Sequence, residues 1–159
     1  MTLEDRVKKH EGLSLNIYKD SLSIPTIYYG HRVRHGEVYL GTIADAERYL
    51  RNDIDIARHG AMSLFPVYNE IDSVRKDVLV ELVYNMGANK IKQAFPRFVH
   101  NVNRKAWEDA ANELKFADGK SRLSRWYEQV KERRAEDMLE RLAYGGAEDG
   151  LLTAAGERA

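Results

Sequence analysis

The sequence of 159 residues contains no cysteine, only three prolines and no excess charge of either sign. Without cysteine there is no disulfide, no thiol nucleophile and no cysteine-based zinc site, and folding can proceed in a reducing cytoplasm. The 25 basic residues balance the 25 acidic ones, so the net charge gives no reason to expect nucleic acid or an anionic membrane as a partner. No apolar run reaches the roughly 18 residues of a membrane span, so stable membrane insertion is not expected.

Signals for targeting and for metal binding are also missing. The first residues, Met-Thr-Leu-Glu-Asp-Arg, lack the basic start and apolar core of a signal peptide. The five histidines show no metal-ligand spacing, such as a pair four residues apart on a helix with a nearby Glu. We therefore expect no signal peptide, no metal and no cofactor.

The first 41 residues predict a short helix followed by a small sheet. Thr2 and Asp5 have the spacing of a capping box, and Gly12 is a natural stop for a helix that ends near Glu11. The residues after Gly12 alternate apolar and polar as in a strand, residues 20–23 have the composition of a turn, and residues 25–29 are rich in β-branched and aromatic side chains. A third short strand and a loop are expected within residues 32–41.

The rest of the chain reads as helical. Thr42 and Asp45 form a second capping signature, and apolar residues at helical spacing predict a helix that ends near Gly60. Apolar residues between Ile71 and Met86 cover more than one helical stripe, which predicts a helix buried on most sides. The expected fold is α+β and mostly helical, with an N-terminal lobe (1–60), a helical lobe (61–145) and a flexible tail (146–159). Substrate is expected in a groove between the lobes.

Two carboxylates and a hydroxyl gather in the N-terminal lobe. Glu11 lies at the end of the first predicted helix, Asp20 at the hairpin turn and Thr26 on the returning strand. Glycosidic bond cleavage needs one carboxyl group to protonate the leaving oxygen and a second to handle a water or the sugar cation. In a chain with 25 acidic residues, the spacing alone favours a pair of solvated surface carboxylates over catalytic acids.

Several segments, in the same order, resemble the phage-type lysozyme family. They are HEGLSLNIYKD (residues 10–20), TIYYGH (26–31), PVYNEIDSVRKDVLVELVYNMG (66–87), AWEDAANEL (106–114) and SRWY (124–127), followed by Arg133 and Arg134. Together they cover most of residues 1–144. The resemblance implies a lysozyme fold and a muramidase that acts on peptidoglycan without a cofactor.

The resemblance also implies a role for individual residues. Glu11 is the general acid, Asp20 its partner carboxylate, and Thr26 a hydroxyl that helps to place the attacking water. Arg134 is implied to position the acid. An inverting enzyme would hold the two carboxyl groups about 6.5 to 9.5 Å apart, and a gap nearer 5 Å would indicate direct attack by Asp20.

Two further residues are expected to bind substrate. The resemblance puts an aromatic side chain at the position of Tyr84 against the sugar, and Arg32 lies just after the motif, within reach of the same groove. Trp107 and Trp126 are instead predicted to be buried in the core, since Trp107 has apolar neighbours at core spacing.

The residues that close the motif are expected to support it. Gly30 ends the motif, and His31 after it has Asp53 on the next helix as a predicted ion-pair partner. Ser23 and Tyr28 depart from the family pattern, which generally has glycine there and so points to positive φ or close backbone approach. The Tyr28 ring could pack beneath the hairpin, form part of a sugar platform, or partly fill the cleft.

The leading hypothesis is a monomeric endolysin that hydrolyses the β-1,4 bond between N-acetylmuramic acid and N-acetylglucosamine. The family reading implies synthesis in a host cytoplasm and action in the periplasm after release by a separate membrane-permeabilising factor. One alternative is a lytic transglycosylase that needs only Glu11. The other is a weakly active or non-catalytic peptidoglycan-binding homologue.

Overall fold

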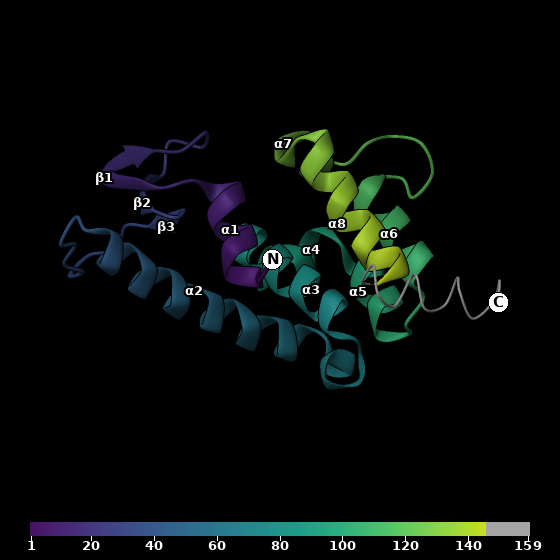
Figure 1. Cartoon of the computed structure of the whole chain (residues 1–159). Coiled ribbons are helices and arrows are strands. Elements are labelled where there is room, and N and C mark those ends of the chain that lie inside the picture. Colours follow the sequence, from purple (N-terminus) through teal and green to yellow (C-terminus); the bar gives the residue numbers. More distant parts are fainter. Residues whose placement is uncertain (146–159) are drawn as a thin grey trace. The chain divides into compact units, whose positions relative to one another are not determined.

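The computed structural model describes residues 1–145. The chain divides into two compact units, Met1–Ala57 and the residues from Arg58 onward, and helix α2 (Ile43–Leu64) runs across the boundary. The named strands all belong to the first unit, whereas the second is built of helices (Figure 1). This confirms the α+β, mostly helical fold. The predicted tail, 146–159, lies outside the described residues.

Helix α1 (Leu3–Glu11) begins and ends where the sequence predicts. The Thr2 hydroxyl accepts a hydrogen bond from the Asp5 amide at 3.1 Å, and the Asp5 carboxylate accepts one from the Thr2 amide at 3.3 Å. Gly12 follows the helix with φ of 73°, a conformation that glycine adopts without steric cost. Glu11 is therefore the last residue of α1.

The three strands form one antiparallel sheet in the order β1 (Ser14–Lys19), β2 (Pro25–Tyr28) and β3 (His31–Arg32). Thr26 lies on the central strand and pairs with Tyr18 on one side and Arg32 on the other. The register thus places two of the residues singled out from the sequence, Thr26 and Arg32, in one row across the sheet with Tyr18.

Helix α2 is longer than the sequence predicts. It was expected to end near Gly60, but it continues to Leu64. A Cβ on Gly60 would lie 3.0 Å from Cγ1 of Val83 and 3.5 Å from the Cβ of Ala88. Gly60 therefore serves close packing against α3 rather than helix termination, which explains why the prediction was wrong.

The second unit contains one 3₁₀ turn and the remaining helices. They are η1 (Pro66–Glu70), α3 (Ser73–Met86), α4 (Ala88–Ala94), α5 (Pro96–Asn103), α6 (Trp107–Lys115), α7 (Arg125–Val130) and α8 (Glu132–Tyr144). Every residue from Val78 to Val83 in α3 is buried, which confirms the helix buried on most sides. Helix α3 packs against α4 and α8, and α6 packs against α5, α7 and α8. No helix within residues 1–145 is both long and apolar enough to cross a bilayer.

Arg75 joins the start of α3 to the end of α8. Its Nε donates to the Leu142 carbonyl at 2.7 Å and its Nη2 to the Ala143 carbonyl at 2.8 Å. The guanidinium lies 4.5 Å from the ring centroid of Trp107. One cation therefore satisfies carbonyls at a helix C-terminus, where positive charge is favourable.

We expect Arg75→Met to lower the free energy of unfolding by about 2 to 3 kcal/mol, because carbonyl groups of α8 lose charged hydrogen-bond donors. Urea denaturation measures the loss. Arg97→Met is the control, since that side chain is 65% exposed in its ion pair with Glu113 and such pairs contribute about 0 to 1 kcal/mol. Equal losses in the two variants would contradict the role given to Arg75.

Candidate active site

The carboxyl group of Glu11 rests against the turn between β2 and β3. Gly30 in that turn has φ of 73°, and a Cβ built on it would lie 2.8 Å from Oε2 of Glu11 and 3.3 Å from its Cδ. Real Cβ atoms do not approach other atoms so closely. Residue 30 must therefore lack a side chain both for its backbone conformation and for the space that the Glu11 carboxyl occupies.

The turn after β1 holds the carboxylate of Asp20. Its Oδ1 accepts hydrogen bonds from the backbone N–H groups of Leu22 at 2.8 Å and Ile24 at 2.9 Å. The backbone of Asp20 also bonds to the turn, through its N–H to the Ile24 carbonyl at 3.0 Å and its carbonyl to the Ser23 N–H at 2.9 Å. The carboxylate is thus fixed by the backbone of its own turn.

The Thr26 hydroxyl is fixed by the same turn. Thr26 is buried, and its Oγ1 donates to the Ile24 carbonyl at 2.8 Å. Because the hydroxyl hydrogen is used in that bond, the lone pairs of Oγ1 remain to accept a hydrogen bond from another group. Asp20 and Thr26 therefore share Ile24 as their backbone partner.

Tyr18 links the two carboxylates. Partial burial raises the pKa of the Tyr18 phenol, and the negative charges of Glu11 and Asp20 raise that pKa further. Both acids therefore act on one ring, and Tyr18 itself pairs with Thr26 in the sheet. Tyr18, which sequence reasoning did not single out, thus lies within electrostatic range of Glu11 and Asp20 and opposite Thr26 in the sheet.

Arg32 and Tyr84 are the two residues predicted to bind substrate. Arg32 is exposed on β3 directly across from Thr26. Tyr84 is half-buried on α3 of the second unit. Contact of either residue with a sugar stays a prediction.

Arg134 has a partner that the sequence did not reveal. Its Nε and Nη2 donate to Oε2 of Glu81 at 3.3 and 3.2 Å, and Nη1 of Arg141 lies 4.0 Å from Oε1 of the same carboxylate. Glu81 is completely buried in α3. The available signal was a single acid in an otherwise apolar run, with two arginines seven residues apart on the last helix. A role for Arg134 beside Glu11 stays a prediction.

His31 forms the predicted pair with Asp53 and one more. Its Nδ1 lies 2.7 Å from Oδ2 of Asp53, and its Nε2 lies 2.8 Å from Oε1 of Glu37. Burial alone would lower the pKa of His31, but the hydrogen bonds to the two carboxylates outweigh burial and raise it. The His31 imidazole therefore ties β3 to α2 and to the loop before it.

The two departures from glycine keep the backbone that glycine would favour. Ser23 has φ of 62° and Tyr28 has φ of 60°, a conformation that is rare for a bulky residue. The Tyr28 side chain is completely buried. Of the three arrangements considered from the sequence, the ring packs beneath the hairpin, and it neither forms a sugar platform nor fills a cleft.

The tryptophans differ from each other. Trp126 is only 3% exposed, which confirms its predicted place in the core. Trp107 is half-buried, and the guanidinium of Arg75 covers one face of its ring. The prediction of burial was wrong for Trp107, which is the first residue of α6 and stacks against a charged guanidinium rather than lying in the apolar core.

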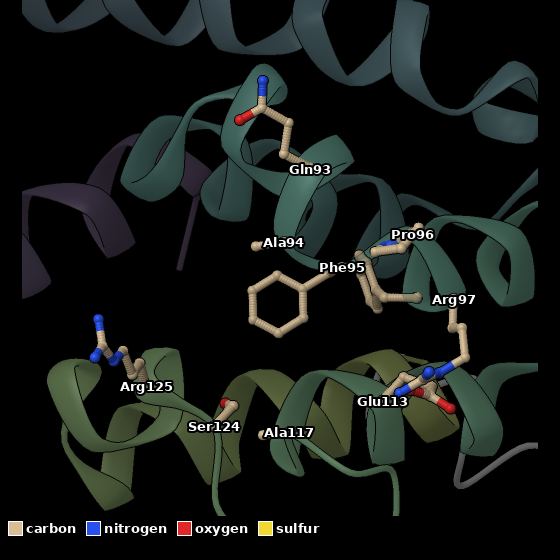
Figure 2. A pocket seen from close by; sticks show the side chains of 10 residues that line it. Gln93, Ala94, Phe95, Pro96, Arg97, Glu113, Ala117, Ser124 and Arg125 are labelled. Carbon is tan, nitrogen blue, oxygen red and sulfur yellow. The ribbon is translucent and has the colours of Figure 1, made fainter.

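The second unit contains a pocket of about 380 Å³. Figure 2 shows the Phe95 ring in the pocket, between Gln93 on one side and Ser124 and Ala117 on the other, with Arg97 beside Glu113. Nε of Arg97 donates to Glu113 at 2.9 Å. None of the site residues predicted from the sequence lines this pocket.

Comparison with known proteins identifies the family of this chain. Residues 8–139 match the family described as Phage lysozyme, which covers more than half of the chain. The chain belongs to the phage lysozyme family. Two similar proteins from Dictyostelium discoideum are Probable T4-type lysozyme 1, 26% identical, and Probable T4-type lysozyme 2, 27% identical. Each alignment spans 140 residues and covers 72% of this chain and 82% of the relative. Membership supports a lysozyme-like function directed at peptidoglycan.

We expect Asp53→Asn to lower the pKa of His31, measured by NMR titration, and to destabilise the fold by about 1 to 3 kcal/mol at pH 5.5. Because the pKa of His31 is raised in the folded protein, its protonation stabilises the fold fully at pH values below the pKa of an unfolded histidine, near 6.5. This stabilisation is lost as the pH rises through the pKa of His31 in the folded protein. The difference from wild type should therefore shrink by pH 9. Asp109→Asn, at an exposed position on α6, is the control. An unchanged His31 pKa would disprove the pairing.

We expect Gly30→Ala to reduce lytic activity by 10-fold or more, because its methyl group needs the space of the Glu11 carboxyl. Gly36→Ala is the matched control: Gly36 also has positive φ, 87°, but a Cβ there meets nothing within 4 Å. Both variants carry similar backbone strain. Equal activity in the two variants at a temperature where both are folded would show that contact with Glu11 is unimportant.

Proposed function

We propose that this protein is a muramidase that hydrolyses the β-1,4 bond between N-acetylmuramic acid and N-acetylglucosamine in peptidoglycan. The observation that carries the proposal is the placement of two carboxylates around Tyr18, one on the Gly30 turn and the other in the same turn as the Thr26 hydroxyl. Glycoside hydrolysis needs such a pair of carboxyl groups with different surroundings.

In the proposed reaction Glu11 is the general acid. It donates its proton to the glycosidic oxygen as the bond from that oxygen to the sugar C1 breaks. The Asp20 carboxylate faces the positive charge that develops on the sugar ring. The negative charge is held ready for this role, because the turn backbone orients it before substrate binds.

The attacking water is placed by Asp20 and Thr26. Thr26 Oγ1 accepts a hydrogen bond from one O–H of the water, which remains on the oxygen as the new hydroxyl at C1, while Asp20 takes the other proton as the water oxygen bonds to C1. After the reaction Glu11 is deprotonated and Asp20 is protonated, and exchange with solvent returns a proton to Glu11 and removes one from Asp20. Hydrolysis thus consumes one water and yields a reducing end on muramic acid.

Substrate contacts and setting complete the proposal. Arg32 extends the site from the row that contains Thr26, and Tyr84 offers a partly exposed ring to a sugar. We propose that the protein works as a monomer on glycan strands. It would be made in a host cytoplasm and act in the periplasm after release.

The test is lysis of Gram-negative cells stripped of their outer membrane, with mass spectrometry of the released sugars. We expect Glu11→Gln and Asp20→Asn each to lower the rate by about 10²-fold or more. Asparagine at position 20 keeps an oxygen that can accept the Leu22 and Ile24 N–H groups, so its fold should survive. Glu108→Gln, exposed on α6, is the control and should lyse at the wild-type rate.

The products separate the remaining possibilities. Reducing-end muramic acid products that disappear in both variants support the hydrolase. Anhydro-muramic products with full activity in Asp20→Asn would instead establish a lytic transglycosylase. A folded wild-type protein that binds peptidoglycan without releasing sugars would establish a binding homologue.

A further inference from the structure

Tyr28 combines a backbone conformation that suits glycine with a side chain that is completely buried. Its φ is 60° and its exposed fraction is 0%. Such conformations persist in bulky residues only where the surrounding structure determines them, and they gather at functional sites. The contacts of Tyr28 therefore indicate which part of the backbone its side chain fixes.

The Tyr28 hydroxyl is anchored by two hydrogen bonds. It donates to Oδ2 of Asp45 at 2.5 Å and accepts from the Gly41 N–H at 2.9 Å. Its ring packs on Tyr39 and Tyr49, with centroids 5.9 and 5.6 Å away. The end of β2 is thereby tied to a buried aromatic cluster.

Asp45 is a firm anchor because it is fixed by other groups as well. Its side chain is 1% exposed, Oδ2 also accepts from the Leu40 N–H at 3.0 Å, and Oδ1 accepts from Nη2 of Arg48 at 2.7 Å. The Thr42 hydroxyl accepts from the Asp45 N–H at 3.1 Å, but the Asp45 carboxylate bonds to Tyr28 and its other partners. The second predicted capping box is therefore only half formed.

The backbone anchored by Tyr28 carries the candidate active site. Two residues before it, Thr26 presents its hydroxyl, and two residues after it, Gly30 forms the surface on which the Glu11 carboxyl rests. Movement of the Tyr28 backbone would displace both groups. The Tyr28 ring itself is buried and contacts no substrate.

We propose that Tyr28 is a positioning residue, whose hydroxyl bond to Asp45 fixes the β2–β3 turn and so the placement of the Glu11 carboxyl for catalysis. The proposal rests on the proposed function, since the effect is exerted on the reaction of Glu11. It makes this tyrosine a constructive part of the site rather than a departure that weakens it.

The first experiment compares Tyr28→Phe with Tyr49→Phe. Tyr49 belongs to the same cluster, and its hydroxyl donates one hydrogen bond, to the Val38 carbonyl at 3.0 Å, but it lies on α2 rather than β2. With a labelled soluble glycan fragment of peptidoglycan as substrate, we expect Tyr28→Phe to lower kcat by about 10- to 100-fold with KM within about twofold, because small misplacements of a catalytic group cost that much. Tyr49→Phe should keep kcat within about threefold.

The pH dependence of kcat provides a second readout. If Tyr28→Phe changes the surroundings of the Glu11 carboxyl, the part of the kcat–pH profile that reports the general acid should shift in that variant. The same part of the profile should be unchanged in Tyr49→Phe. A merely structural role would lower the melting temperature of both variants without moving either profile. Rates are compared at a temperature where both variants are fully folded.

The third experiment tests the route through Asp45. If Tyr28 acts through that carboxylate, the double variant Tyr28→Phe/Asp45→Asn should have the kcat of the slower single variant instead of the product of the two reductions. Independent, multiplicative effects would overturn the assignment. Equal kcat values for Tyr28→Phe and Tyr49→Phe would also overturn it.

Failure of this inference is distinguishable from failure of the proposed function. If Glu11→Gln is inactive and Tyr28→Phe has the wild-type kcat, the function stands and the positioning role is wrong. If Glu11→Gln is fully active, the proposed function itself is wrong, and any loss in Tyr28→Phe must have another origin.

Discussion

The first unit depends on the contact between the Glu11 carboxyl and a residue with no side chain. Gly30 lies so close to Glu11 that a methyl group would clash with it, so the end of α1 and the β2–β3 turn must be placed to within tenths of an ångström. The capping box at Thr2 sets where α1 begins, and the buried hydroxyl of Tyr28 sets where β2 ends. The start of α1, the end of β2 and the β2–β3 turn together determine the contact between Glu11 and Gly30, which are 19 residues apart in the sequence.

The two units use buried charge in different ways. In the first unit, His31 lies between Asp53 and Glu37, so each ring nitrogen meets a carboxylate. In the second unit, Glu81 has no exposed surface and is approached by Arg134 and Arg141 from α8. Burying such charges costs free energy that only good geometry recovers, so they fix which elements pair more surely than they add stability.

Local patterns in the sequence predicted what depends on neighbours along the chain. The Thr2 cap, the stop at Gly12, the hairpin strands and the buried run in α3 all follow from spacing within a few residues. Partners across the fold were harder to foresee. Gly60 looked like a helix end because its packing partner, Val83, is remote in sequence. Asp53 could be named as a partner of His31, whereas the contact of His31 with Glu37 depends on the path of the loop after β3. The arginine partners of Glu81 and the buried position of Tyr28 depend on how separate elements pack, which periodicity does not specify.

The hydrogen bonds of Ile24 limit how the length of this hairpin turn can vary. The Ile24 N–H donates to the Asp20 carboxylate, and the Ile24 carbonyl accepts from the Thr26 hydroxyl. The positions of both candidate groups are therefore fixed by the backbone of one residue. An insertion or deletion between residues 20 and 24 would change which peptide each group meets and would alter both at once. Loop-length changes are usually tolerated at exposed hairpin tips, but at this one the length of the turn is itself part of the site.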